Sequence, residues 1–391
     1  MQRPLILILM LCVPLFPVRA QQRGVNVNVV NPSALPRTGE LVELSWSDLL
    51  RISPSLTSSA VAAQDSVSGL LLPAQLIDAD QDGTPDLLLV RVTLPPGGAT
   101  SFRVVPSAAG GTPTASLTDA RFVLPREDLA WENDRIAFRM YGPALAKDVG
   151  NGIDVWTKRV RSLIVGKWYK AAETAPPGKD PYHEDHGEGA DYFSVGRTLG
   201  AGGCAPMMGD SLIQPGVFAS HRIVATGPLR AQFELTYNPV RLGEQRITQK
   251  LRIAIDAGSN LNRIEVLFEA GGEAVEVPFA AGIVKRKGVT AHADTGSCAA
   301  SLWGLTTDRP EEGFLGTGIV MASSAFRQVG ETPVHLLLIG KATAGAPATY
   351  FAGAGWTRSG DFSTEEEWHR YLHEFGLKLQ SPFRVTMTAG I

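Results

Sequence analysis

The sequence predicts a mainly β protein built from antiparallel sheets. Many short runs of β-branched, aromatic or alternating residues are bounded by Gly, Pro, Asn or Asp, which is the pattern of strands joined by turns. The chain has 391 residues, of which 41 are Gly and 26 are Pro, a composition that suits many such turns. Strands and helical segments do not alternate regularly, so a doubly wound parallel sheet is not expected.

The predicted strands extend over most of the chain. In the run 247–255 the apolar residues alternate with polar ones, which indicates a strand with one face in water for part of its length. The predicted strands are 25–30, 70–77, 87–94, 102–105, 136–141, 162–165, 233–237, 249–255, 264–268, 318–321, 334–339 and 383–387.

One helix is predicted near the C-terminal end, over residues 364–375. Thr364 and Glu367 have the spacing of a capping box, and Gly376 is expected to end the helix. The side chains at helical spacing that should pack against the sheets are Trp368, Tyr371, Leu372 and Phe375.

The first twenty residues have the pattern of a secretory signal peptide. Arg3 precedes an apolar run that is too short to span a bilayer comfortably, and small residues precede Gln21, before which we expect cleavage. The protein is therefore expected to be periplasmic or secreted. A low-complexity stretch at 110–116 divides the remainder into a small N-terminal β module, 21–110, and a large two-sheet domain, 111–391.

Charge and cysteine content limit the classes of partner. The 36 basic and 39 acidic residues include no polybasic tract, so neither nucleic acid nor, after signal cleavage, a membrane is expected as a partner. Hydrophobic residues make up 44% of the chain, which predicts a large folded core. Cys204 and Cys298 remain after cleavage, and they either form a disulfide in an oxidising compartment or stay as free buried thiols.

An acidic stretch between two predicted strands has part of the pattern of a calcium loop. Its aspartates recur at every second position and a glycine marks the sharp turn, but no glutamate occupies the twelfth position of an EF-hand. The same pattern is typical of a tight hairpin whose aspartates bind backbone amides. Both interpretations stay open for Asp78, Asp80, Asp82 and Asp86, and Ca²⁺ is the only cofactor that the sequence suggests.

A second candidate site follows from the predicted strand 136–141. Strand alternation places Arg135 and Arg139 on one face, where they are either solvated or form a clamp for a planar carboxylate. Aromatic rings nearby favour a sugar-binding face, because sugar C–H groups pack well on them. The residues that this interpretation brings in are Trp131, Glu132, Trp156 and Lys158.

The densest group of ionisable residues is the run YHEDHGEGADY, which extends from Tyr182 to Tyr192. His183 and His186 have a spacing that allows a metal site, completed by Asp185 or Asp191. Proton-transfer chemistry by histidine and tyrosine is a second interpretation, and a loop of satisfied hydrogen bonds is the third. The further acids of this run are Glu184 and Glu188.

Several long motifs resemble one family of secreted bacterial proteins. The motifs WENDRIAFRMYG, GIDVWTKR, KWY, YHEDHGEGADYFSVGRTLGAGG, ATGPLR, FELTY, IDAGSNLN and GIVKR occur in the order found in the family catalogued as domain of unknown function 4861. The resemblance covers about residues 25–383. It implies a β-supersandwich of the galactose-mutarotase type and a role in degrading polysaccharides that contain uronic acids. The chain departs from the family at Glu132-Asn133, where Glu-Ser is more usual, and at Ala225-Thr226, where Asp-Asn is usual.

The sequence and the resemblance together predict an enzyme that acts on acidic oligosaccharides or polysaccharides by β-elimination. Arg135, Arg139 or Lys158 is expected to neutralise the substrate carboxylate. His183 or His186 is expected to remove the C5 proton, and Tyr182 to protonate the leaving oxygen. Residues expected to bind the substrate are Trp131, Glu132, Arg135, Trp156, Glu188, Asp191 and Tyr192. One alternative is a glycoside hydrolase that uses paired carboxylates from Glu184, Glu188 and Asp191. The other alternative is a glycan-binding or epimerase-like protein.

Overall fold

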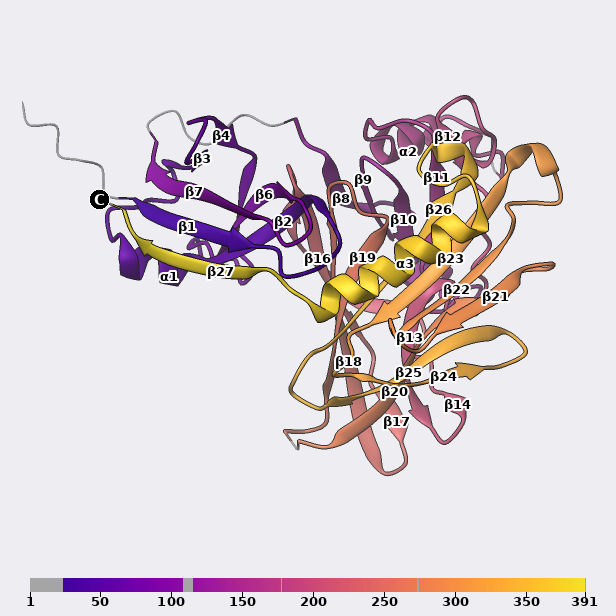
Figure 1. Ribbon diagram of the computed structural model, residues 1–391. Helices are drawn as coiled ribbons and strands as arrows, with labels where there is room; N and C mark the ends of the chain where they lie inside the picture. The colour runs from indigo at the N-terminus through magenta and orange to yellow at the C-terminus, as the bar shows by residue number, and fades with distance from the viewer. Residues whose placement is uncertain (1–23, 108–114, 177, 273, 391) are drawn as a thin grey trace, which may run out of the picture.

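The computed structural model describes residues 24–107, 115–176, 178–272 and 274–390. Its strands pair antiparallel in five sheets, so the prediction of a mainly β, antiparallel protein is confirmed. Figure 1 shows a smaller group of strands beside a larger group, and the chain passes from the helix Glu365–Gln380 on the larger group to the strand Arg384–Ala389 in the smaller one. The predicted signal peptide, 1–20, lies outside the described residues.

The smaller group is built from both ends of the described chain. In strand β1 the side chains of Val25, Val27 and Val29 are at most 1% exposed and pack in one core with Phe102. Strand β27 pairs with β1 along its whole length, so residues 384–389 complete the first sheet (Figure 1). One sheet has the order β27 (Arg384–Ala389), β1 (Val25–Val30), β7 (Ala99–Pro106), β3 (Val61–Asp65) and β4 (Leu71–Leu72), and the other has β2 (Arg37–Ser45), β6 (Leu87–Leu94) and β5 (Ala74–Ile77).

The larger group centres on a nine-stranded sheet. The side chains at 247, 249, 251, 253 and 255 of β18 are buried, whereas Lys250 and Arg252 lie on the outer face, as the alternation predicts. The sheet order is β15 (Phe218–Thr226), β16 (Arg230–Tyr237), β18 (Gln245–Asp256), β19 (Leu261–Glu269), β26 (Ala348–Trp356), β23 (Phe314–Met321), β22 (Ala299–Leu305) and β21 (Thr290–Asp294), and β17 (Val240–Leu242) pairs with β18.

Two five-stranded sheets pack against the inner face of this nine-stranded sheet, which gives a sandwich with one continuous core. Aromatic contacts cross the core: the rings of Trp131 and Phe233 lie 4.8 Å apart, and those of Phe268 and Phe279 lie 5.8 Å apart. One sheet has the order β12 (Gly189–Asp191), β11 (Asp154–Lys158), β10 (Ala137–Met140), β9 (Asp128–Asn133) and β8 (Thr118–Val123), and the other has β14 (Ser211–Leu212), β13 (Ala201–Met208), β20 (Glu276–Val284), β25 (His335–Thr343) and β24 (Phe326–Glu331).

The predicted C-terminal helix is present, but it is longer than predicted. Helix α3, Glu365–Gln380, begins at Thr364, whose side chain accepts a hydrogen bond from the Glu367 amide. It does not end at Gly376 but continues to Gln380. Gly376 lies inside the helix against Ser297, where a side chain would clash. The buried side chains that hold the helix on β22 and β23 include Trp368 and Leu372, as predicted.

Two further helices were not predicted. Helix α1, Trp46–Ile52, begins at Ser45, and α2, Val165–Glu173, begins where a strand at 162–165 was expected. The predicted strand 70–77 is also divided, into β4 and β5 on either side of Pro73, which has no amide hydrogen to donate to a ladder. Short 3₁₀ turns complete the described structure: η1 (Pro143–Leu145), η2 (Pro181–His183), η3 (Pro310–Glu312) and η4 (Thr357–Ser359).

Polar contacts join the smaller and larger groups of strands. Arg230 of β16 is 4% exposed and binds Glu43 of β2 at 2.7 Å and Asp256 of β18 at 2.6 Å. The side chain of Gln75 in β5 also accepts hydrogen bonds from the amides of Leu229 and Arg230, both at 2.7 Å. These bonds attach the N-terminal strands to the end of the large sheet.

Two further sequence questions are answered within the described residues. Cys204 and Cys298 are both buried and free, which is the second of the two predicted alternatives. No helix in this part of the chain combines the length and the apolar character needed to cross a membrane.

Candidate functional site

The residues from Tyr182 to Asp191 lie at one end of the sheet formed by β8 to β12. Strand β12 pairs with β11, so that Asp191 lies opposite Trp156. Close approach of the two strands depends on Gly189, which has a φ of +117° and leaves no space for a Cβ beside the carbonyl of Thr157. The short strand therefore holds Asp191 next to the residues of β10 and β11.

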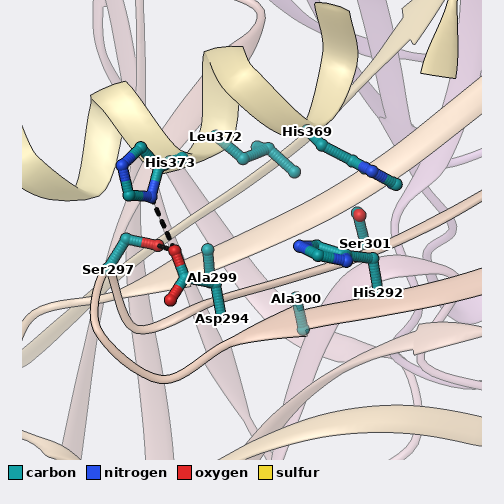
Figure 2. Close-up of a pocket in the computed structure, with 9 residues that line it drawn as sticks. All are labelled: His292, Asp294, Ser297, Ala299, Ala300, Ser301, His369, Leu372 and His373. Carbon is teal, nitrogen blue, oxygen red and sulfur yellow. Dashed lines mark hydrogen bonds and ion pairs between the residues drawn. The ribbon is translucent and has the colours of Figure 1, made fainter. Parts of the chain in front are cut away.

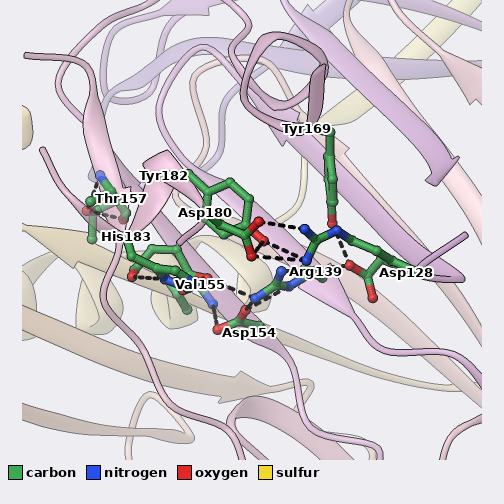
Figure 3. A network of polar contacts seen from close by, with 12 residues as sticks. Asp128, Arg139, Asp154, Val155, Thr157, Tyr169, Asp180, Tyr182 and His183 are labelled. Carbon is green, nitrogen blue, oxygen red and sulfur yellow. Dashed lines mark hydrogen bonds and ion pairs between the residues drawn. The ribbon is translucent and has the colours of Figure 1, made fainter. Parts of the chain in front are cut away.

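Arg139 is the centre of a buried network of carboxylates (Figure 3). Its Nη2 lies 2.6 Å from Asp154 Oδ2 and 2.8 Å from Asp191 Oδ2, and its Nη1 lies 3.7 Å from Asp128 Oδ2. Arg139 is 5% exposed. The register places Arg139 directly opposite Asp154 across β10 and β11, which explains the strongest of these contacts. Tyr141 also donates to Asp154 at 3.0 Å.

The network contains more negative groups than Arg139 can neutralise. Burial raises the pKa of Asp191 well above its usual value, and the nearby Asp154 raises it further. Burial also raises the pKa of Asp128. Oδ1 of Asp191 and Oδ1 of Asp128 are buried without a hydrogen-bond partner among the described residues. The charged form of Asp191 is therefore less favoured than that of a solvated aspartate, because three ionised carboxylates cannot share one guanidinium at low cost.

His183 lies at the surface of this network. Its Nδ1 is 3.2 Å from the backbone oxygen of Asp191 and 3.6 Å from the Asp191 carboxylate, and its side chain is 52% exposed. The ring packs edge-on against Tyr182, with the ring centres 4.7 Å apart. This arrangement orients one ring nitrogen toward the protein and leaves the imidazole accessible to a ligand.

Tyr182 lies beneath His183 and is 3% exposed. Its hydroxyl is 3.0 Å from both Asp180 and Arg126, and its ring stacks on Trp156 at 4.8 Å. Burial raises the pKa of Tyr182 to about 12. The phenol therefore remains protonated at neutral pH.

A pocket of about 280 Å³ opens on the other side of the Tyr182–Gly189 loop, against α2. Trp168 contributes the indole ring, whose Nε1 donates to Glu188 at 3.2 Å. Glu188 is also paired with Lys167 at 2.7 Å, and this hydrogen bond lowers the pKa of Glu188. The exposed side chains of Glu184 and His186 line the same pocket.

The positions of His183 and His186 do not favour a shared metal ion. His183 faces Asp191, whereas His186 lines the pocket beside α2. Within the described residues, the two histidines do not belong to any group of three His, Cys, Asp or Glu donors that lie within reach of one ion. The third ligand that the metal interpretation needs is therefore not in place.

Five of the proposed substrate contacts are buried. Trp131, Glu132 and Trp156 are 0% exposed, Lys158 is 1% exposed and Asp191 is 6% exposed. Lys158 donates to Glu132 at 2.7 Å and to the backbone oxygen of Asn133 at 2.6 Å, so two of the three N–H donors of its ammonium group are bonded within the core. These side chains do not reach a ligand in this conformation. The same holds for the guanidinium of Arg139, which the three aspartates surround.

Glu132 has a specific structural role at the start of α2. Its carboxylate accepts hydrogen bonds from the amides of Ile164, at 2.8 Å, and Val165, at 2.7 Å. The N-cap residue Ile164 has no side-chain acceptor of its own. Glu132 thus replaces the missing cap and places a negative charge at the positive end of the helix.

Exposed guanidinium groups lie on the outer side of the Tyr182–Gly189 loop. Arg159 and Arg358, 37% and 31% exposed, both pair with Asp185, at 3.1 Å and 3.3 Å. Asp185 thus holds two cations at this loop, which also carries Glu184 and Glu188. Tyr192, next to Asp191, lies with its ring 6.1 Å from that of Trp356, and burial raises its pKa to about 12. Arg135 does not join this group, because it pairs with Asp361.

Sequence reasoning missed several residues of the network. Asp128, Asp154, Tyr169 and Asp180 all contact it, and Arg358 comes from a distant part of the chain. Asp154 and Arg139 both belong to predicted strands or motifs, and pairing those strands correctly would have placed them together. The position of Arg358 in η4 follows only from the long-range pairing of β26.

The aspartate loop joins β5 to β6. The amide of Gly83 donates to Asp78 at 2.9 Å, and the Asp86 carboxylate accepts from Ala79 at 2.6 Å, as the hairpin interpretation predicts. Oxygens of Asp78, Asp80 and Asp86 nevertheless lie within 4.8 Å of one another, and Asp78 Oδ1 has no partner among the described residues. Asp82 binds the Thr84 amide instead. The donor set therefore suits Ca²⁺, and the loop also holds its shape through its own hydrogen bonds.

The fold and the site together define a mainly β sandwich protein with a buried arginine–carboxylate network below a half-exposed histidine. Residues 29–385 match the family described as domain of unknown function DUF4861, and the chain belongs to this family. It is 32% identical over 384 residues to a protein of Formosa agariphila described as uncharacterized protein P7, and the alignment covers 92% of this chain and 93% of that protein.

Two solved structures from Enterococcus faecalis have a partly similar architecture. A protein in glycosyl hydrolase family 38 gives a TM-score of 0.47 at 9% identity, covering 93% of this chain and 47% of the other. An alpha-mannosidase gives a TM-score of 0.44 at 9% identity, covering 95% of this chain and 46% of the other. The chain thus spans about half the length of these structures, and neither their activity nor their substrate follows for it.

Proposed function

We propose that this protein is a carbohydrate-active enzyme that cleaves uronic-acid-containing oligosaccharides by β-elimination, with His183 as the proton acceptor. The observation that carries this proposal is the half-exposed imidazole held against Asp191 above a buried network. A base needs an accessible nitrogen and a partner that fixes its orientation, and both are present at His183. Because residues 1–20 have the pattern of a secretory signal peptide, we place this activity in the periplasm or the medium.

In this reaction the imidazole takes the C5 proton of the uronate, the C4–O bond breaks, and a C4=C5 double bond forms. The leaving oxygen receives a proton. We assign the donation to Tyr182, whose phenol burial keeps protonated, and its hydroxyl must leave Asp180 and Arg126 to reach the leaving oxygen. The carboxylate of the substrate must be neutralised to make the C5 proton acidic enough.

We assign the neutralising charge to Arg159 and Arg358 rather than to Arg139 or Lys158. Their guanidinium groups are 37% and 31% exposed and both pair with Asp185, whereas Arg139 and Lys158 are enclosed by protein oxygens. Guanidinium groups bind planar carboxylates with two hydrogen bonds, which suits a uronate. Arg139 then acts by positioning Asp191.

A hydrolase is the second candidate, and one observation favours it. Glu184 and Glu188 line the same pocket as the indole of Trp168, so that two carboxyl groups and a sugar-stacking ring share one space. The pKa of Glu188 is lowered by its hydrogen bond from Lys167, which suits the ionised partner of such a pair.

Incubation with a panel of uronate oligosaccharides separates these functions. Elimination produces new ultraviolet absorbance from the conjugated product, whereas hydrolysis produces reducing ends without this absorbance. His183→Ala should abolish elimination while binding of the oligosaccharide, measured by calorimetry, changes little. His221→Asn, in the edge strand β15, is the matched control and should keep full turnover. Binding without turnover on every glycan would instead indicate a glycan-binding protein and contradict the proposal.

A further inference from the structure

Three of the seven histidines lie together on the side of the sandwich that α3 covers, away from the Tyr182–Asp191 segment. His369 and His373 are one helical turn apart on α3, and His292 and Asp294 are two residues apart on the edge strand β21. Residues at these spacings share a helix face and a strand face, respectively. Figure 2 shows the four side chains in the space between the helix and the strand, and all four line one small pocket.

The pocket contains polar groups that the protein does not satisfy. Ser301, which pairs with His292 across β21 and β22, is 1% exposed, and its Oγ has no hydrogen-bond partner among the described residues. The Nε2 of His369 is also buried without a hydrogen-bond partner among the described residues. A carboxylate oxygen of Glu365 lies 3.7 Å from it, which is too far for a hydrogen bond. Buried polar atoms normally have partners, so these two atoms point to a ligand.

The chemistry of the lining selects the kind of ligand. Three imidazoles and one carboxylate are the donors that zinc and related divalent metals take in a four-coordinate site. No lysine or arginine is among the described residues that line the pocket. Burial and the adjacent His292 lower the pKa of His369, although Glu365 and Glu366 oppose this effect, so the neutral form that binds metal is favoured.

The side chains must rotate to converge on one ion. At present the rings of His292 and His369 stack at 4.4 Å, and His373 Nδ1 lies 2.6 Å from Asp294 Oδ2. The four donors are not all within reach of a single ion in this arrangement. His292 and His373 are exposed, so rotation of these two side chains is not blocked by the core. An exposed ion pair such as that of His373 is a weak obstacle to it.

We propose that His292, His369, His373 and Asp294 bind one divalent transition-metal ion, with zinc preferred, between β21 and α3. The ion fastens the edge strand of the nine-stranded sheet to the helix that covers it. Ser301 Oγ then lies beside the site, where it can hydrogen-bond to a ligating side chain or to a water that is not bound to the metal.

Metal titration of the full chain, freed of metal by a chelator, tests the proposal. Zinc should bind with a stoichiometry of one in calorimetry and raise the Tm. Cobalt should give the visible absorption of a four-coordinate centre. His292→Gln and His373→Gln change exposed residues and should each weaken zinc binding roughly tenfold or more, with unchanged circular dichroism. His369→Gln should do the same, and the two exposed variants decide the question if it does not fold.

The matched controls are His183→Gln and His186→Gln, which remove imidazoles from the other histidine pair. Both should keep wild-type zinc affinity. If zinc binding is lost in His183→Gln and His186→Gln but kept in His292→Gln and His373→Gln, the ion belongs to His183 and His186. That result, or the absence of both the zinc heat and the cobalt absorption in the wild-type protein, overturns the proposal.

Discussion

The Nζ of Lys158 lies 2.7 Å from Oε2 of Glu132, and neither side chain is exposed to solvent. This pair joins β11 to β9 directly below the start of α2. The sequence motifs associate both residues with a binding site, but the structure places them in the core. They can lie there because each neutralises the charge of the other. The carboxylate also receives two amides of α2, so the charge is fully bonded.

Removal of one member of this pair should be costly. Lys158→Met is expected to lower the free energy of unfolding by about 3–5 kcal/mol, because Glu132 then stays buried without its cation. Adding Glu132→Gln should restore part of the loss. Lys250 and Glu269 form an ion pair of the same 2.7 Å on the surface, and Lys250→Met should cost about 0–1 kcal/mol. Urea unfolding measures each change, and equal costs for the two lysines would contradict the buried role.

The network around Arg139 predicts a dependence of stability on pH. Because the folded pKa of Asp191 is raised by burial, the folded state binds more protons than the unfolded state above the usual aspartate pKa of about 4. The contribution of Asp191 to wild-type stability therefore falls as the pH rises from about 4 toward its folded pKa. Asp191→Asn, which cannot ionise, should lose this fall, and its stability relative to wild type should improve from acid to neutral pH.

Asp180 is the control for this prediction because its shift has the opposite sign. Burial opposes its charge, but hydrogen bonds from Arg126 and Tyr182 hold the pKa of Asp180 below its usual value. Its stabilising contribution is present above the unfolded pKa and is lost as the pH falls. Asp180→Asn should therefore be most costly at neutral pH. Unfolding curves at several pH values that show the same trend for both variants would contradict the assignment.

Gly376 is expected to be intolerant of any side chain. A Cβ at this position would clash with the carbonyl oxygen and lie 2.8 Å from Cβ of Ser297. Gly376→Ala should lower stability by about 1–3 kcal/mol, although alanine normally favours a helix. Arg370→Ala, on the exposed face of α3, is the control and should change stability little. A stabilised Gly376→Ala variant would show that the helix does not rest on Ser297 as described.

The aspartate loop allows a direct test for calcium. If Asp78, Asp80 and Asp86 bind Ca²⁺, a chelator should lower the Tm and added calcium should restore it by mass action. Asp80→Ala should remove this response, whereas Asp82→Ala should retain much of it, because Asp82 binds the Thr84 amide. An identical melting curve with and without chelator would leave only the hairpin role for these aspartates.

The cysteines should be insensitive to reductant. Both are free and buried, and burial raises the pKa of Cys204 to about 12. We therefore expect the same Tm with and without a reducing agent, and two labelled thiols per chain after denaturation of the cleaved, exported protein. A reductant-dependent fall in Tm would indicate a disulfide.

Local patterns in the sequence were sufficient for the predicted strands other than 162–165 and for the start of α3. Fifteen of the 27 strands in the described residues, among them β9, β11 and β12 of the candidate site, were not predicted. Val25–Val30 and Leu87–Leu94 are predicted to the residue, because alternation and bounding turn residues are properties of each segment alone. Helix α2 was missed for the opposite reason. Its cap is the carboxylate of Glu132, about thirty residues earlier in the chain, and the β-branched Ile164 and Val165 resemble a strand.

The candidate site could be found only in part. A dense run of His, Tyr and acidic residues is visible in the sequence, and the structure places His183 at an accessible surface. Whether a charged residue is buried depends on the strands that pair around it. Arg139 and Arg358 therefore could not be assigned a free or an enclosed guanidinium before the sheet order was known.

The pairing of β27 with β1 has a consequence for the order in which the chain matures. Val25 pairs with Ala389 and Val30 with Arg384, so the first sheet takes its last strand from residues made some 350 positions later. Until those residues emerge, the edge of β1 carries unpaired amides and carbonyls that can template pairing with other chains. During synthesis or export the N-terminal strands therefore depend on the C-terminal strand for protection, and loss of β27 should promote aggregation more than loss of activity.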